Sequence, residues 1–242
     1  MYTFAGRIRY SETDAEETLT IPALMNYLQD CSTFQSEDGN VGIRYLADHN
    51  WGWIVNFWQI DILRLPKLGE EVVTGTSPYS LKGFMGLRNF MMETKEGERL
   101  VNVNSVWSLL DLQGLKPVRV PEEMYGVYTL NEPFDMEYSP RKVVLPKEEP
   151  ERFDGIRVMP YMMDSNHHLN NARYLSLLSD LLGDGRTIRR LRIEYKKQAV
   201  VGDLMIPALY RGEQETAAFL DEEGAAYCAL EIYRRNRTDE GP

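Results

Sequence analysis

The chain carries the same chemical pattern twice, and this internal repeat limits its fold more than any other feature. Apolar residues lead to Asp14, then to a short polar loop, and then to a helix pattern that begins near Thr20. The same order leads to Asp164, 150 residues later, and to a second helix pattern that begins at Asn170 or Asn171. A divergent repeat of this kind predicts two halves built on one plan.

Each half continues with segments that are typical of β-strands. Residues 60–70 and 193–203 both predict a strand followed by a turn at a glycine. Further strand patterns cover 72–76, 87–94 and 100–112 in the first half, and 204–210, 216–220 and 225–233 in the second. One long helix followed by consecutive strands predicts an antiparallel sheet that covers the helix, so we expect an α+β fold.

The stretch between the halves is rich in proline and in charge. It contains Pro133, Pro140, Pro146 and Pro150 together with the charged run 147–149, which suits a connection better than a core. We therefore expect an N-terminal domain at residues 1–124, a linker at 125–152 and a C-terminal domain at 153–242.

The composition of the chain narrows the classes of function. With 242 residues, 43% of them hydrophobic, the chain can bury a large core. A formal net charge of −10 argues against a protein that binds nucleic acid. Cys31 and Cys228 are the only cysteines, which indicates buried thiols in a reducing compartment and no cysteine zinc site. Without a signal peptide or a run of about eighteen apolar residues, we expect a cytoplasmic protein with no stable membrane association and no bound metal.

The densest cluster of reactive side chains lies in residues 161–174. Asp164, Asn166, His168 and Asn170 occupy every second position, so an extended segment would project all four from one side. Leucines at helical spacing follow, which places the cluster at a helix entrance whose free N–H groups suit an oxyanion. A histidine beside an orienting carboxylate predicts acid-base chemistry, and the alternative is an ordinary polar turn and helix cap.

The two copies of the repeat are not chemically equal. Where the second half has Asn166 and His168, the first half has Glu16 and Thr18. Only the second copy keeps the amide and the imidazole, which predicts one active site there, with the first half shaping the pocket wall. The alternative is that neither copy is catalytic.

Several motifs resemble those of the acyl-acyl carrier protein (acyl-ACP) thioesterases of the bacterial type. The segment from Asp164 to Tyr174 is similar to the family's Asp-x-Asn-x-His-x-Asn-Asn signature, which precedes its second long helix. Ser105-Val-Trp107 and the downstream Pro121-Glu-Glu are similar to two further family segments. The resemblance implies a tandem hotdog fold, in which two antiparallel sheets each wrap around a helix. It also implies hydrolysis of the acyl-ACP thioester to free fatty acid, with acyl carrier protein as partner and no cofactor.

One departure from the family pattern bears on the mechanism. Plant members carry a Glu-Cys pair where this chain has Gln198 and Ala199, so the resemblance implies water, and not a cysteine, as the nucleophile. We assign Asp164 and His168 to acid-base work and Asn166 to positioning, and the division of labour between Asp164 and His168 stays open.

Substrate contacts are expected from amide and aromatic side chains. The amides are those of Asn170, Asn171 and Gln198, and the acyl slot is expected to be walled by Trp53 and Phe57, with Trp51 and Trp58 beside them. An amide does not titrate near neutral pH, so Gln198 could hold water or substrate but cannot be the base. The alternatives are an exposed strand amide for Gln198 and ordinary core positions for the aromatic residues.

The most basic stretch is a candidate docking surface for an acidic carrier protein. It consists of Arg189, Arg190, Arg192, Lys196 and Lys197, with Arg141 and Lys142 as a second group. Opposite charges would steer an acidic carrier protein to this surface, and the alternative is one solvated face of a strand. The tandem layout can complete its own pseudo-dimer, and association into a homodimer stays open.

Three other functions compete with acyl-ACP hydrolysis. A hotdog thioesterase acting on acyl-coenzyme A would share the chemistry and differ in the carrier. A non-catalytic acyl-carrier binding protein would keep the fold without turnover. A hotdog dehydratase fits the tandem single-chain layout poorly.

Overall fold

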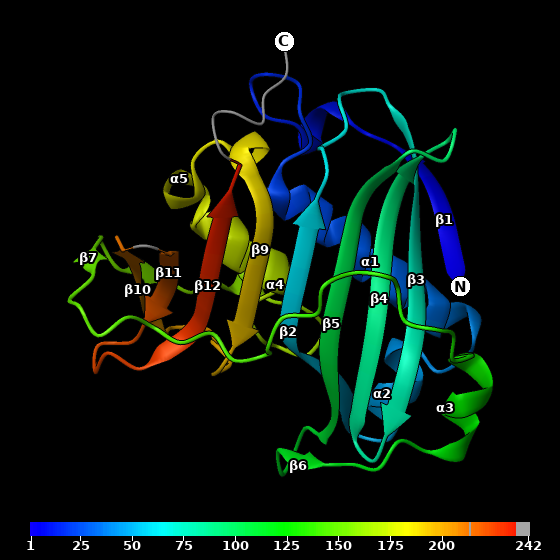
Figure 1. The fold of residues 1–242 in the computed structure, drawn as a ribbon. Helices are drawn as coiled ribbons and strands as arrows, with labels where there is room; N and C mark the ends of the chain where they lie inside the picture. Colours follow the sequence, from blue (N-terminus) through cyan, green and yellow to red (C-terminus); the bar gives the residue numbers. More distant parts are fainter. Residues whose placement is uncertain (213, 236–242) are drawn as a thin grey trace.

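The computed structural model describes residues 1–212 and 214–235, and its main feature is one broad sheet (Figure 1). Helices lie behind the sheet, on what we call the helix face. A long connecting segment crosses the opposite face, which we call the outer face (Figure 1). Both halves of the chain contribute strands to this sheet.

The described strands pair in antiparallel fashion and join the two halves edge to edge. Their order is β1-β3-β4-β5-β2-β9-β12-β11-β10-β7, with β6 paired to β5 and β8 paired to β10. The first half contributes β1 (Tyr2–Arg7), β2 (Trp51–Ile62), β3 (Glu71–Lys82), β4 (Met85–Thr94), β5 (Arg99–Asp111) and β6 (Lys116–Pro117). The second half contributes β7 (Glu151–Arg152), β8 (Ile156–Arg157), β9 (Ile188–Tyr195), β10 (Leu204–Tyr210), β11 (Glu215–Leu220) and β12 (Ala226–Arg234). Residues 57–61 of β2 pair with residues 190–194 of β9 and form the junction.

Each half wraps its part of the sheet around a helix. In the first half this helix is α1 (Ile21–Asp38), which begins as predicted with Thr20 as N-cap and Pro22 in the first turn. Buried residues of α1, including Leu24 and Leu28, share one hydrophobic core with Leu175 of the second half. The tandem hotdog fold is confirmed, with the difference that the two sheets are continuous.

The helix of the second half spans the predicted leucine pattern but is interrupted. It consists of α4 (Asn171–Leu177) and α5 (Ser179–Leu182), and the break falls at Leu178. The hydroxyl of Ser176 donates to Ala172 O at 3.1 Å, and that of Ser179 donates to Ser176 O at 2.7 Å. Such hydroxyls compete with the backbone ladder of a helix, which accounts for the interruption.

The remaining helices are short and lie in connections. They are α2 (Ile43–Asp48), α3 (Glu122–Val127) and the 3-10 helices η1 (Tyr10–Glu12), η2 (Pro160–Met162) and η3 (Gly185–Thr187). Because η1 and η2 precede Asp14 and Asp164 at the same interval, they belong to the repeat.

Backbone hydrogen bonds reproduce the repeat beyond the helices. Gly69 N–H donates to Ile8 O at 2.9 Å, and Gly202 N–H donates to Val158 O at 3.0 Å. Both glycines have positive φ, 81° and 95°, a conformation that other residues adopt at a cost. The turn predicted at each glycine therefore closes on the same strand position in each half.

The connecting segment begins later than predicted. Since α3 runs across the predicted boundary at residue 124, the stretch without helix or strand is 128–150. The outer face binds the backbone of this segment. Gln59 donates to Glu137 O at 2.6 Å, and its side-chain oxygen accepts from Ser139 N–H at 2.8 Å. The segment thus crosses the outer face of the sheet and is bonded to it at β2 (Figure 1).

Candidate active site

A cavity of about 700 Å³ opens where β2 and β9 separate. Beyond Phe57 the strand β2 has no further pairs with β9 in the described residues. After Tyr195 the chain stays beside β12, where Lys196 N–H donates to Tyr227 O at 2.8 Å. The ends of β2 and β5 form one wall, and residues 164–171, α4 and residues 195–200 form the other. Of the predicted catalytic and substrate-binding residues, Asp164, Asn166, His168, Asn171, Gln198 and Trp53 line this cavity.

The segment around Asp164 is a tight turn, which corrects the prediction of an extended segment. The Asp164 carboxylate accepts from Asn166 N–H at 2.8 Å and from His168 N–H at 3.2 Å. Asp164 N–H donates to His168 O at 2.8 Å, and His167 has a positive φ of 59°. Asp164 therefore organises the backbone and does not hydrogen-bond the imidazole of His168.

The first half contains the same turn without the same chemistry. The Asp14 carboxylate accepts from Glu16 N–H at 3.1 Å and from Thr18 N–H at 2.8 Å. Asp14 N–H donates to Thr18 O at 2.8 Å, and Glu17 has a positive φ of 60°. The same aspartate-centred turn thus forms in the half where no imidazole follows.

His168 lies partly buried at the wall of the cavity. Its Nδ1 atom is buried and has no hydrogen-bond partner in the described part of the chain. Burial lowers the pKa of His168, while the negative charge of Asp164 raises it by a smaller effect and His167 lowers it further. The imidazole is therefore neutral at neutral pH and able to accept a proton.

More of the backbone N–H groups at the start of α4 form hydrogen bonds within the protein than predicted. Asn170 is the N-cap, and its side-chain oxygen accepts from Ala172 N–H at 2.9 Å. Its backbone oxygen accepts from Arg173 N–H at 2.9 Å. Asn170 is therefore occupied as the N-cap, and it is not among the residues lining the cavity. We therefore withdraw the predicted oxyanion role of these two N–H groups.

Asn171 joins the two halves at the cavity wall. Its side-chain amide donates to the side-chain oxygen of Gln29, on α1, at 3.1 Å. Its backbone oxygen accepts from the hydroxyl of Tyr195 at 3.2 Å. Asn171 thereby ties α4 to α1 and to the end of β9.

The predicted aromatic wall is only partly correct. Trp53 lines the cavity, but Phe57 lies on the outer face, with the Arg192 guanidinium 5.8 Å from its ring centre. A β-bulge between Val55 and Phe57 shifts the register of β2 against β5, and such a bulge interrupts the alternation of side chains along a strand. Trp58 is fully buried in the core.

Asn56, the extra residue of this bulge, lines the cavity and was missed by sequence reasoning. Its side-chain oxygen accepts from the Ser108 hydroxyl at 2.6 Å. Tyr174 and Tyr195 also line the cavity, and their ring centres lie 5.4 Å apart. Tyr174 could have been found in the sequence, because it ends the family-like segment. Asn56 could not, because nothing in this sequence indicates the bulge.

Neither cysteine can reach the cavity. Cys31 and Cys228 are fully buried, and burial raises the pKa of both thiols to about 12. Ala199 is buried as well, and its backbone oxygen accepts from Leu169 N–H at 3.0 Å. A thiolate nucleophile is thus incompatible with these positions. Within residues 1–212 and 214–235, no group of three or more histidine, cysteine, aspartate or glutamate side chains could hold a metal ion.

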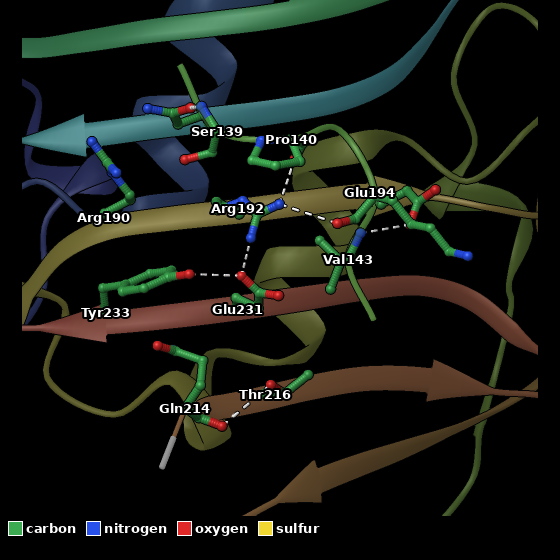
Figure 2. Close-up of polar contacts among 12 residues, drawn as sticks. Ser139, Pro140, Val143, Arg190, Arg192, Glu194, Gln214, Thr216, Glu231 and Tyr233 are labelled. Atoms are coloured by element: carbon green, nitrogen blue, oxygen red, sulfur yellow. Dashed lines mark hydrogen bonds and ion pairs between the residues drawn. The ribbon is translucent and has the colours of Figure 1, made fainter. Parts of the chain in front are cut away.

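The predicted docking stretch divides between two surroundings (Figure 2). Arg192 is buried under the linker, where it pairs with Glu231 and donates to Pro140 O and Lys142 O. Arg190 pairs with Asp61 at 2.5 Å. Burial removes Arg192 from any docking surface, which corrects that part of the prediction.

The other three basic residues remain at the surface. Lys196 and Lys197 are exposed at the cavity wall, where they pair with Glu194 at 2.5 Å and Asp221 at 3.1 Å. Arg189 is exposed, with its guanidinium 5.6 Å from the ring centre of Tyr233.

Comparison with known proteins identifies the family. Residues 1–128, more than half of the chain, match the family model described as the acyl-ACP thioesterase N-terminal domain. The chain belongs to the acyl-ACP thioesterase family. Its relatives include the palmitoyl-acyl carrier protein thioesterase of Gossypium hirsutum, 25% identical over 208 residues, and an acyl-[acyl-carrier-protein] hydrolase of Cuphea viscosissima, 26% identical over 213 residues. Both alignments cover 79% of this chain, which spans about half the length of these curated relatives (50% of each).

Solved structures of acyl-ACP thioesterases share the fold. An acyl-ACP thioesterase from Bacteroides thetaiotaomicron superposes with a TM-score of 0.84 at 22% identity and covers 96% of this chain and 97% of its own. A 12:0-ACP thioesterase from Umbellularia californica gives a TM-score of 0.83 at 18% identity, covering 97% and 96%. Among the described residues, none of the helices of this family member has the length and hydropathy to cross a membrane.

Proposed function

We propose that the chain hydrolyses the thioester of acyl-ACP and releases a free fatty acid. The observation that carries this proposal is the neutral, cavity-facing His168 held by the Asp164 turn in a fold shared with acyl-ACP thioesterases. A base that is neutral near its working pH can accept a proton from water.

His168 is the base in this mechanism, and water is the nucleophile. Because Nδ1 is sealed and unpartnered, the other ring nitrogen, Nε2, takes the proton of a water whose oxygen attacks the thioester carbon. The tetrahedral intermediate then collapses, its C–S bond breaks, and the carrier leaves as a thiolate that takes the proton of the imidazolium. Asp164 stabilises that imidazolium through its negative charge.

Side-chain amides stabilise the developing oxyanion. Asn166 and Gln198 line the same cavity as His168, and each offers amide N–H donors that do not titrate. This assignment replaces the helix entrance, whose N–H groups at Ala172 and Arg173 bond to Asn170.

The acyl group in this proposal arrives on acyl carrier protein. Lys196 and Lys197 at the cavity wall, together with exposed Arg189, offer positive charge to an acidic carrier. The walls come from both halves of one chain, so a second copy is not required to complete the cavity. We place the reaction in the cytoplasm, where free thiols such as Cys31 and Cys228 persist.

One observation favours a second candidate function, a non-catalytic acyl-carrier binding protein. A catalytic histidine usually has an orienting partner, and Nδ1 of His168 has none in the described residues. Binding of acyl-ACP without turnover would establish this alternative.

Hydrolysis of acyl-ACP by wild type, His168→Ala and Asp14→Ala tests the proposal. We expect wild-type turnover, a loss of roughly a hundredfold or more in His168→Ala, and near-wild-type turnover by the folded fraction of Asp14→Ala. Full activity in His168→Ala would remove the imidazole from the mechanism. The same acyl group on coenzyme A separates the two carriers, because a preference for coenzyme A would contradict the acyl-ACP assignment.

A further inference from the structure

A second, smaller cavity lies in the first half of the chain. It has a volume of about 60 Å³, enough for a group of a few heavy atoms. Its walls include Ser32 and Ser36 on α1, Tyr128, and the side chain of Arg88 on β4. Trp53 is among the residues that line this cavity and also the larger one described above.

Arg88 is the unusual member of this small cavity. Within the described residues its guanidinium donates to the side-chain oxygen of Gln35 at 2.8 Å and to the hydroxyl of Thr76 at 3.3 Å, both from Nη1. No carboxylate in that part of the chain forms an ion pair with it. Its charge rests instead against the ring of Tyr128, at 5.0 Å from the ring centre. Three of its five N–H donors, those on Nε and Nη2, have no hydrogen-bond partner among residues 1–212 and 214–235.

A guanidinium in this position selects strongly among ligands. Arg88 is half-buried, and this burial lowers its pKa; charges withdrawn from water in this way are normally paired. The end of an alkyl chain in this cavity would displace water from the unbonded N–H groups of Arg88 and would accept no hydrogen bond from them. A carboxylate would accept two parallel hydrogen bonds from the planar fork and neutralise its charge.

The size of the two cavities completes the description of the ligand. The small cavity fits a carboxylate group, and the cavity of about 700 Å³, which Trp53 also lines, has room for a hydrocarbon chain. A carboxylate attached to an alkyl chain is a fatty acid, which the proposed hydrolysis releases.

We propose that Arg88 binds the carboxylate of a free fatty acid whose alkyl chain passes Trp53 into the active-site cavity. The acid then lies inverted relative to the acyl group of the substrate and occupies the same space. Product bound in this way inhibits hydrolysis. The supply of ligand and the inhibition rest on the proposed function, whereas the binding site itself does not.

Calorimetric titration tests binding without turnover. A medium-chain fatty acid and the fatty alcohol of equal length are titrated, below micelle formation, into wild type, Arg88→Met, Arg88→Lys and Arg99→Met. Arg99, on the neighbouring strand, is a matched control, because it is partly exposed and pairs with Glu93 at 3.7 Å. We expect wild type and Arg99→Met to bind the acid about tenfold or more tightly than the alcohol, as a charge-assisted hydrogen-bonded pair predicts. We expect Arg88→Met to lose this preference and Arg88→Lys to keep part of it.

Two results would overturn the proposal. Equal affinity of wild type for acid and alcohol would do so without any variant, and so would an unchanged preference in a folded Arg88→Met protein. Inhibition of acyl-ACP hydrolysis by the acid, relieved in Arg88→Met, would support the regulatory part. Acid-selective binding by a protein that hydrolyses no acyl-ACP would uphold the site and reject the proposed function instead.

Discussion

At the scale of single residues, the repeat provides an internal control for Asp164. Asp14 and Asp164 accept backbone hydrogen bonds at the same two positions of the same turn. Only Asp164 has an imidazole nearby, and its charge raises the pKa of that imidazole against the larger effect of burial. Structural and chemical effects of the carboxylate can therefore be separated by comparing the two aspartates.

We predict that Asp164→Asn keeps the turn and shifts the pH profile. Asparagine retains the side-chain oxygen that accepts the N–H groups of residues 166 and 168, but it removes the charge that raises the pKa of His168. The wild-type acid limb of kcat/KM lies below the usual histidine pKa of about 6.5, because burial lowers it. In Asp164→Asn the limb moves to still lower pH, with reduced activity on the plateau.

Stability measurements provide the control for this variant. Asp164→Ala and Asp14→Ala each lose two accepted backbone hydrogen bonds, so each should lower the free energy of unfolding by about 1–3 kcal/mol. An acid limb that stays in place in Asp164→Asn would show that the Asp164 charge does not reach the base.

At the scale of elements, the linker is fixed to the sheet by a buried ion pair (Figure 2). Arg192, with 8% of its side chain exposed, binds Glu231 and two linker carbonyl oxygens. Glu194 accepts from Val143 N–H at 2.9 Å, and the Tyr233 hydroxyl donates to Glu231 at 2.8 Å. The charges of β9 therefore position the linker.

We predict that Arg192→Met destabilises the fold by about 3–5 kcal/mol, because it leaves Glu231 buried without its cation. The double variant Arg192→Met/Glu231→Leu should recover most of this loss. The control is Arg211→Met, whose pair with Glu151 is 72% exposed at the arginine and should contribute at most about 1 kcal/mol. Urea unfolding measures all three. A single variant as mild as the control would contradict the role of the pair.

Sequence patterns predicted elements well where one local rule decided the outcome. The helix starts at Thr20 and Asn170 follow from capping, and the turns at Gly69 and Gly202 follow from backbone freedom. Prediction failed where a local pattern was overridden. The bulge at Asn56 moved a neighbouring aromatic residue off the cavity wall.

The candidate site shows the same division. Its six predicted catalytic and substrate-binding members were found because they cluster in sequence or lie beside a family-like motif. The extended arrangement of residues 164–170 failed because side-chain oxygens of aspartate bond nearby N–H groups and close a turn. The prediction of a docking surface on the basic stretch was partly wrong, because a sequence shows a charged residue but not its partners. Buried Arg192 and exposed Lys197 could not be distinguished in this way.

At the scale of the whole molecule, the two halves are held together independently of their covalent connection. Residues 57–61 pair with residues 190–194, and α1 and α4 share one core. The side chains of Asn171 and Gln29 bond across the halves at 3.1 Å.

We predict that cutting the linker leaves a stable complex. A protease site inserted between Lys147 and Glu148, both exposed, should yield two fragments that elute together at the size of the intact chain. Size-exclusion chromatography of cut protein with and without urea makes the comparison. Separation of the fragments without denaturant would show that the covalent link, and not the sheet and core, holds the halves.

The point at which the pairing of β2 with β9 ends limits how substitutions can alter stability and substrate size in this protein. Five residue pairs hold the halves together there, and the cavity begins where the pairing stops. Substitutions that extended the β2–β9 pairing toward Trp53 would stabilise the fold and fill the space that the substrate needs. Substitutions that shortened the β2–β9 pairing would enlarge the cavity and weaken the contact between the two halves. Thermal tolerance and substrate size are thus opposing demands on the same few residues, and selection for one is expected to be limited by the other.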